Sequence, residues 1–319
     1  MLDILTITAP IFLLIGIGYL ARWRGLLSPV QLSGVGTFVL YFSLPALVIK
    51  ALTQSPLEDV INAHFLLAYG MGSLITLALV LYAARHFMRK PLGEAAIQAL
   101  GMSASNSGFI GYPVAALVLG PVAAGKFLAM CMMVENLLII PGALILAEAG
   151  QQRDVSAGVL VRHTLQRLAR NPIMIGLAFG LTVAISGISL PSPIERVIEM
   201  LASASAPAAL FVIGGTLYGL KLGGMWRDIV TIASGKLLLH PLLIISCFLA
   251  LTLVVPDLDV MLLAGALLFA SCPMISVYPL LGARFNMEGV GSAALMVSTL
   301  GSFITLSAAI WLVNQHLLN

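Results

Sequence analysis

The chain has 319 residues, of which 60% are hydrophobic and 9% are charged, and 16 Lys and Arg against 13 Asp and Glu give a net charge of +3. Soluble proteins are about 45–50% apolar and about 25% charged, so this composition excludes a water-soluble fold. The basic excess is also too small to hold a nucleic-acid backbone across a broad surface.

Ten apolar stretches, each of about bilayer length, follow one another along the chain. A helix satisfies its own backbone hydrogen bonds in lipid, and no stretch shows the alternating polarity of a barrel strand, so all ten are predicted to be membrane helices. The predicted spans are Ile4–Ala21, Gly34–Leu52, Phe65–Ala84, Ala95–Leu119, Phe127–Ala147, Pro172–Ile188, Ala202–Leu220, Ile229–Val255, Val260–Leu281 and Val290–Val313. The expected fold is an all-α integral membrane protein. The first span is expected to be retained, because no small-residue cleavage site follows it.

Basic residues fall mainly in alternate loops. The odd-numbered loops hold Arg22, Arg24, Arg85, Arg89, Lys90, Arg153, Arg162, Arg167, Arg170, Lys221, Arg227 and Arg284, whereas the even-numbered loops hold only Lys50, Lys126 and Arg196. The positive-inside rule therefore predicts that the odd loops face the cytoplasm and that both termini lie outside. The cysteines Cys131, Cys247 and Cys272 all lie inside spans, so no disulfide framework is expected.

The second half of the chain repeats residues of the first half in the same order. The matched residues are Ala9-Pro10-Ile11 with Asn171-Pro172-Ile173, Ser43 and Pro45 with Ser205 and Pro207, and Ser105 and Tyr112-Pro113 with Ser271 and Tyr278-Pro279. Each half has five spans, an odd number, so the second half enters the membrane from the opposite side. We therefore predict two inverted repeats, residues 1–147 and 172–319, joined by a cytoplasmic linker, 148–171. Inverted repeats are characteristic of secondary transporters.

The fourth and ninth spans contain proline, glycine and serine where the other spans are plainly apolar. Proline removes a backbone donor and clashes one turn back, so each span is expected to break near its middle, at Gly111 and Pro113 and at Pro273 and Pro279. Freed N–H groups and half-helix dipoles would then form an anion site. The predicted substrate-binding residues are Ser105, Asn106, Ser107, Gly108, Ser271, Cys272 and Ser276. The alternative is that these residues only kink their helices, which is the interpretation we favour for Pro45 and Pro207.

Several of these features occur together in one known family. They are the prolines of the second and seventh spans, the Asn-x6-Pro run from Asn106 to Pro113, the interrupted ninth span beginning at Pro273, and the layout of five plus five spans. In these features the chain resembles the auxin efflux carrier family over essentially its whole length. This family includes bacterial malonate-type carriers and plant PIN-formed auxin exporters, within the bile acid/arsenite/riboflavin transporter superfamily.

The resemblance implies a scaffold domain of spans one, two, six and seven and a transport domain of spans three to five and eight to ten. It also implies that spans four and nine cross, that the transport domain moves like an elevator, and that the protein is a homodimer in the bacterial inner membrane. Asn106 matches the family's crossover asparagine, which contacts a substrate carboxylate. Cys272 stands at the equivalent position of the ninth span, and the long cytoplasmic loop of the plant exporters is absent. These departures disfavour a plant hormone, and dicarboxylates such as malonate remain the suggested substrates.

Glu135, Lys236 and His240 lie well inside predicted spans, where charge is costly. Glu135 and Lys236 are expected to form an ion pair or to take part in coupling, with H+ and Na+ both left open as coupling ions. The alternatives are a static pair, or a Lys236 side chain that reaches the nearby cytoplasmic surface. His240 is expected to be a satisfied interior histidine, with a proton relay as the alternative. We expect no cofactor, and no His and Cys residues have metal-ligand spacing.

Two segments resemble nucleotide-binding motifs. Gly120 to Phe127 approaches a phosphate-binding loop, but Phe127 replaces the hydroxyl residue and the segment is predicted to be an outer loop. Gly16-x-Gly18-x-x-Ala21 lies inside the first span without a strand before it. An intramembrane enzyme would need a nucleophile or acid pair on facing spans, and only Glu135 could begin one. A secondary transporter of a small organic anion is therefore favoured over an enzyme and over a channel or solute sensor.

Overall fold

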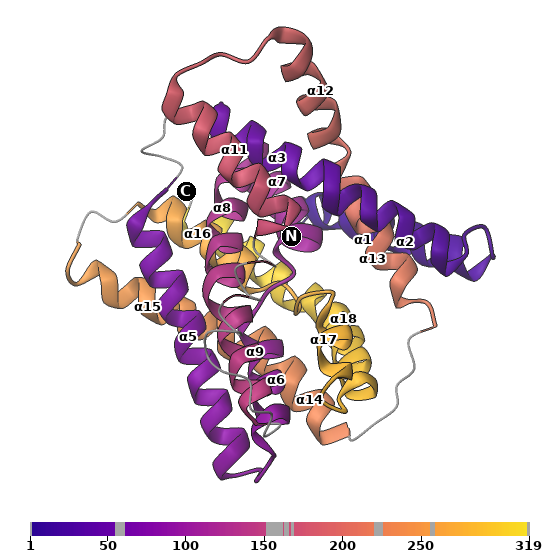
Figure 1. The fold of residues 1–319 in the computed structure, drawn as a ribbon, viewed down its shortest axis with the longest axis vertical. Helices are drawn as coiled ribbons and strands as arrows, with labels where there is room; N and C mark the ends of the chain where they lie inside the picture. Colours follow the sequence, from indigo (N-terminus) through magenta and orange to yellow (C-terminus); the bar gives the residue numbers. More distant parts are fainter. Residues whose placement is uncertain are drawn as a thin grey trace. The chain divides into compact units, whose positions relative to one another are not determined.

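A computed structural model of the chain describes residues 2–54, 61–150, 162, 166, 169–219, 226–255 and 259–317 (Figure 1). Every regular element in these ranges is a helix, and they contain no β-strand beyond one isolated bridge. Most of the predicted linker, residues 148–171, lies outside the described residues.

Ten apolar helices can be compared with the ten predicted spans. Six of the described helices are long and apolar enough to cross a membrane, namely Pro29–Thr53, Ala63–His86, Pro121–Ala149, Ser192–Leu217, Trp226–Thr252 and Gly289–Gln315. Four are shorter, namely Ala9–Trp23, Ser107–Leu119, Pro172–Ser186 and Val260–Ala270. Each predicted span overlaps one of these helices. The all-helical, multi-pass class is confirmed, whereas the ten-helix inverted repeat stays a prediction.

The chain divides into two compact units, each made of three chain segments. The first unit comprises Met1–Asn62, Ser107–Met132 and Ala169–Leu220, and the second comprises Ala63–Asn106, Met133–Leu168 and Lys221–Asn319. The first contains α1 (Leu2–Trp23), α2 (Pro29–Phe38), α3 (Leu44–Thr53), α7 (Tyr112–Leu119), most of α8 (Pro121–Val134), α11 (Pro172–Ser186), α12 (Ser192–Ser203) and α13 (Ser205–Leu217). The second contains α5 (Ala63–His86), α6 (Leu92–Ser103), α9 (Ile140–Ala149), α14 (Trp226–Ser234), α15 (His240–Thr252), α16 (Val260–Ala270), α17 (Tyr278–Ala283) and α18 (Glu288–Leu312). The predicted repeats and the predicted scaffold and transport domains stay predictions.

Several helices begin where a polar side chain caps them. Ser28 Oγ accepts a hydrogen bond from the N–H of Gln31 at the start of α2, and the Gln31 side chain accepts one from the N–H of Ser28. Asn171 caps α11 and Asp259 caps α16 in the same way. These side chains satisfy N–H groups that the first helical turn leaves without a backbone acceptor.

Glycine allows the helices of the first unit to pack closely. In α1, a Cβ on Gly18 would overlap the carbonyl oxygen of Phe211 in α13. Between α3 and α11, a Cβ on Gly176 would lie 3.0 Å from Pro45, and one on Gly180 would lie 2.7 Å from the Leu52 side chain. Gly18 and the Gly176/Gly180 pair are therefore explained by helix packing.

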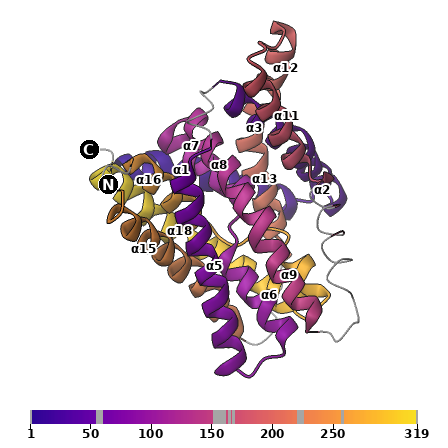
Figure 2. The ribbon, with the colours of Figure 1, turned by 60° about the vertical axis from the view of Figure 1, so that its left-hand side comes forward.

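In the second unit, α6 packs against both α5 and α9 (Figure 2), and α15 also contacts α5. A buried ion pair lies beside these helices, with Lys90 Nζ 2.7 Å from Asp228 Oδ2. Lys90 follows α5, and Asp228 lies in the first turn of α14. Arg85 donates to the main-chain oxygen of Lys90 at 2.8 Å. The ion pair thus joins the segment after α5 to the start of α14.

Four π-helical turns share one sequence feature. The turns Val39–Ser43, Ser107–Gly111, Glu135–Ile139 and Gly235–Leu239 are each followed, two residues later, by a proline: Pro45, Pro113, Pro141 and Pro241. Proline lacks an N–H and clashes with the carbonyl one turn back, so a wider turn before it relieves the clash without ending the helix. A fifth π-helical turn, Val313–Leu317, follows α18.

The predicted starts of the fifth and seventh spans are wrong. The fifth span was expected to begin at Phe127 after an outer loop, but α8 begins at Pro121, directly after Gly120, whose φ of 84° makes the turn. The seventh was expected to begin at Ala202, but α12 already begins at Ser192. Proline is favoured in a first helical turn because its missing N–H would have no acceptor there.

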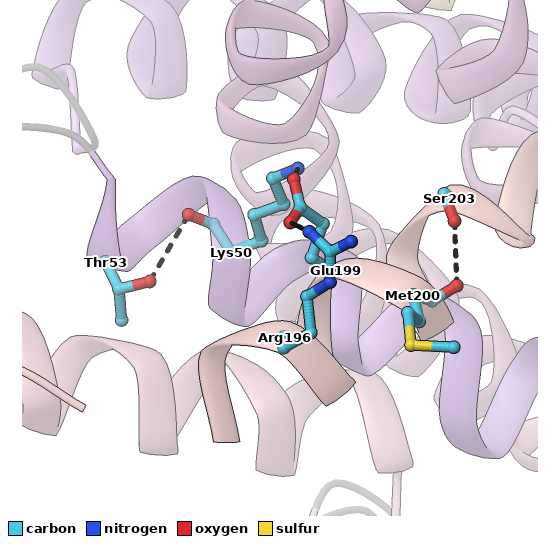
Figure 3. A network of polar contacts seen from close by, with 6 residues as sticks. All are labelled: Lys50, Thr53, Arg196, Glu199, Met200 and Ser203. Atoms are coloured by element: carbon cyan, nitrogen blue, oxygen red, sulfur yellow. Dashed lines mark hydrogen bonds and ion pairs between the residues drawn. The ribbon is translucent and has the colours of Figure 1, made fainter. Parts of the chain in front are cut away.

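The extra helix α12 is held to α3 by a polar network (Figure 3). Glu199 lies 3.2 Å from Lys50 Nζ and 3.4 Å from Arg196 Nη1. All three side chains remain partly in contact with solvent. Lys50 and Arg196, two of the basic residues assigned to the even-numbered loops, therefore share the carboxylate of Glu199.

Candidate functional site

The first interruption follows α6. The helix ends at Ser103, Ala104 adopts extended dihedral angles (φ −118°, ψ 133°), and helical structure resumes at Ser107. Ser105 and Asn106 are therefore non-helical and buried.

The second interruption lies between α16, which ends at Ala270, and α17, which begins at Tyr278. Met274 of this segment forms an isolated antiparallel bridge with Ser105. The N–H of Asn106 donates to the main-chain oxygen of Pro273 at 2.8 Å. Both spans thus leave the helical conformation, and their non-helical segments are joined through the main chain inside the second unit.

The position of the break in the fourth span differs from the prediction. Gly111 and Pro113 were expected at the break, but they lie in the helical stretch that runs from Ser107 to Leu119. Pro279 is likewise helical, as the second residue of α17. An N–H in the first helical turn has no acceptor within the helix, so proline is tolerated there. Pro273 alone of the four lies inside a non-helical segment.

Ser105 lies at the centre of a buried polar cluster in the second unit. Its N–H donates to Glu135 Oε1 at 3.1 Å, and its Oγ accepts from Lys236 Nζ at 2.9 Å. The hydroxyl of Tyr69 lies 3.4 Å from both Ser105 Oγ and Glu135 Oε1. The Glu135 and Lys236 side chains are 1% and 0% exposed, so both ionisable groups are removed from solvent.

Lys236 also contacts a main-chain oxygen and a histidine ring. Its Nζ lies 2.7 Å from the carbonyl oxygen of Ala270 and 2.9 Å from His240 Nδ1. His240 Nε2 lies 3.1 Å from Ser73 Oγ. The alternative in which Lys236 reaches the cytoplasmic surface is therefore wrong, because these interior acceptors hold its ammonium group. A direct Glu135–Lys236 ion pair stays a prediction.

The two ionisable residues occupy corresponding places in their helices. Glu135 is the first residue of a π-helical turn that precedes Pro141, and Lys236 is the second residue of one that precedes Pro241. Such turns are frequent at functional sites. The proline two residues after each turn is therefore a sequence signal that could have marked both positions.

Asn106 is 3% exposed, and its Nδ2 has no hydrogen-bond partner among the described residues. A buried donor left in this state costs about 1–3 kcal/mol. An unsatisfied buried group of this kind in a native structure calls for an explanation, such as a ligand, an ion or a water. The Asn106 amide is thus a donor that a bound molecule could use.

The remaining predicted site residues differ in their surroundings. The main-chain oxygen of Ser271 accepts from Thr305 at 3.0 Å, and Cys272 Sγ lies 3.3 Å from the oxygen of Leu268, while Ser276 is half-buried. Ser107 and Gly108 are buried at the start of the helical stretch in the first unit. Whether these residues contact a substrate stays a prediction.

Tyr69 and Thr305 contact the two interruptions and Ser73 contacts His240, and none of the three was predicted from the sequence. They lie on α5 and α18, far along the chain from the segments that they contact, and nothing in the spacing of these residues signals such a contact. Among the described residues, no group of three His, Cys, Asp or Glu side chains could hold a metal ion.

Comparison with known proteins identifies the relatives of this chain. Residues 3–312 match the family described as membrane transport protein. A Rhizobium meliloti protein named "Putative malonate transporter" is 29% identical over 320 residues, covering 99% of this chain and 97% of that protein. An Escherichia coli K12 protein named "Uncharacterized transporter YfdV" is 25% identical, covering 97% of each chain. A mouse protein named "Lysosomal cholesterol signaling protein" is 23% identical, and the match covers 93% of this chain but 36% of that protein.

Proposed function

This chain belongs to the membrane transport protein family, and from that premise we propose that it is a secondary active transporter of a small organic anion, a mono- or dicarboxylate. The family match also confirms the resemblance to the auxin efflux carriers. Relatives that cover nearly the whole chain are named as transporters, which favours transport over catalysis. The name of the Rhizobium relative suggests malonate as the first substrate to test.

The observation that carries this proposal is the unpaired, buried amide of Asn106 beside two interrupted helices. A carboxylate has only acceptor oxygens when it is ionised, so an amide NH2 group in a dry site is a suitable partner. Ser107 and Gly108 start the next helical stretch, whose positive dipole end favours an anion. In our proposal Ser105, Ser271, Cys272 and Ser276 line the rest of the site, and Glu135, Lys236 and His240 act behind it.

The proposed mechanism is elevator-like alternating access in the bacterial inner membrane. In it, a transport domain carries the bound anion past a scaffold domain, the repeats are inverted, and two copies of the chain form a homodimer with their termini outside. Support comes from the division of the chain into two compact units, since a chain that divides in this way can move one unit as a body. Further support comes from the two interrupted helices, a feature of transporters with inverted repeats.

Reconstitution into proteoliposomes tests the proposal. A transporter should take up labelled malonate with saturation, and unlabelled malonate on the opposite side should accelerate that uptake. A channel would pass malonate without this counterflow, a sensor would bind it without uptake, and an enzyme would convert it. Any of these three results would overturn the proposal. A thermal-shift screen of carboxylic acids would first identify which acid binds, because a ligand of the folded state raises the unfolding midpoint.

A further inference from the structure

We propose that Lys236 is a positioning residue whose ammonium group acts as a built-in cation, holding the two non-helical segments together so that transport needs no added metal cation there. The inference rests on the proposed function for its transport consequence. Its structural part rests only on contacts within the second unit.

The ammonium group contacts acceptors on three separate segments of the chain. A lysine ammonium carries three donors and no acceptor. The partners of Nζ include Ser105 Oγ at 2.9 Å, His240 Nδ1 at 2.9 Å and the carbonyl oxygen of Ala270 at 2.7 Å. The side chain is fully buried, so these contacts replace the water that it has lost.

Two of these partners belong to different interruptions. Ser105 follows the end of α6, and Ala270 is the last residue of α16. A carbonyl at the end of a helix has no intrahelical donor, and the negative end of the helix dipole favours a cation there. A cation at this point satisfies the end of one broken helix and holds the non-helical segment of the other.

The contacts of His240 fix its state. An ammonium group cannot accept a hydrogen bond, so His240 Nδ1 must be the acceptor and carry no proton. The ring proton is then on Nε2, which lies 3.1 Å from Ser73 Oγ and donates to it. We therefore assign His240 as a neutral ring that orients Lys236, in place of a proton relay.

The negative charge of Glu135 also contacts Ser105. The N–H of Ser105 donates to Glu135 Oε1 at 3.1 Å, so one residue contacts the buried carboxylate through its main chain and the buried ammonium through its side chain. Asn106, the next residue, is fixed in turn by its N–H bond to Pro273. Lys236 thus acts on the substrate through Ser105 and Asn106, without contacting it.

The test compares Lys236→Ala with Lys236→Met in proteoliposomes loaded for malonate counterflow. Lys236→Ala leaves space for a small free cation, whereas Lys236→Met fills that space with an uncharged chain of similar length. We expect wild-type transport to be unchanged when Na+ is replaced by choline. Lys236→Ala should raise the KM for malonate by at least about tenfold, and methylammonium or Na+, but not choline, should restore it. Lys236→Met should remain defective with either ion, and Lys50→Ala on the surface should behave as the wild type.

Three results would overturn the inference: wild-type transport that requires Na+, a folded Lys236→Ala variant with normal KM, or a folded Lys236→Ala variant that neither cation restores. Thermal unfolding tests the role of Lys236 without a transport assay. The midpoint of Lys236→Ala should rise with methylammonium and not with choline, and no such rise would also overturn it. Wild-type protein that transports no malonate would instead contradict the proposed function, and the unfolding experiment would still decide the role of Lys236.

Discussion

Lys236 Nζ and Ser105 Oγ are joined by a hydrogen bond of 2.9 Å, although the two residues are 131 positions apart in the chain. The bond is buried, and Ser105 also donates its N–H to Glu135. Main-chain groups that leave a helix inside a membrane have no water to satisfy them, so they need partners of this kind. The interruption after α6 is therefore stabilised by side chains from other helices.

Asn106→Ala should weaken carboxylate binding by about 1–3 kcal/mol, because it removes the one buried amide donor proposed to face the substrate. Asn106→Asp should weaken binding further, since it places a negative charge where the donor was. Both variants keep the main-chain bond from residue 106 to Pro273. Titration calorimetry with malonate measures the affinities of the wild type and the two variants. Binding by Asn106→Asp as tight as by the wild type would remove the amide from the site.

Gly18→Ala should lower the stability of the protein by at least about 1–3 kcal/mol, because the added methyl group overlaps the backbone of α13 at Phe211. Gly16→Ala in the same helix is the matched control. A Cβ there meets nothing within 4 Å, and alanine favours the helix over glycine. Thermal unfolding in detergent should show a lower midpoint for Gly18→Ala alone. Equal midpoints for the two variants would contradict the packing of α1 on α13.

Lys90→Met and Asp228→Asn should each destabilise the protein by about 3–5 kcal/mol, because each leaves one buried charge without its partner. The double variant Lys90→Met with Asp228→Asn should recover much of that loss. Glu199→Gln is the control, since its ion pairs with Lys50 and Arg196 are exposed and should contribute no more than about 1 kcal/mol. Denaturant unfolding of the four variants gives the values, and additive losses in the double variant would show that the pair is not coupled.

Tyr278→Phe should leave the stability unchanged or raise it, because the buried hydroxyl of Tyr278 has no partner among the described residues. Tyr112 is the matched residue of the other half, and its hydroxyl interacts with the side chain of Ser205. Tyr112→Phe should therefore lower the stability by about 0.5–1.5 kcal/mol. The two unfolding midpoints, measured side by side, test this difference. A larger loss for Tyr278→Phe would mean that its hydroxyl has a bound partner.

Much of the fold could be predicted from the sequence because membrane helices are specified locally. A stretch of apolar residues needs no distant partner to be identified as a helix in lipid, and each of the ten predicted stretches overlaps a helix of the described part. The clusters of proline, glycine and serine marked the two interrupted spans for the same reason. Asn106 also followed from its place in a local run of residues, although its role in binding stays a prediction.

The point of interruption and the contacts of the buried charges depended on tertiary structure. Pro113 was expected to break its helix, yet a π-helical turn accommodates it, and the break lies instead at Ser105 and Asn106, where other helices supply partners. The sequence alone left Lys236 free to reach the membrane surface or to face inward. Acceptors on the segment after α6, on α15 and on α16 decide the matter, and residues so far apart in the chain become neighbours only when the helices pack.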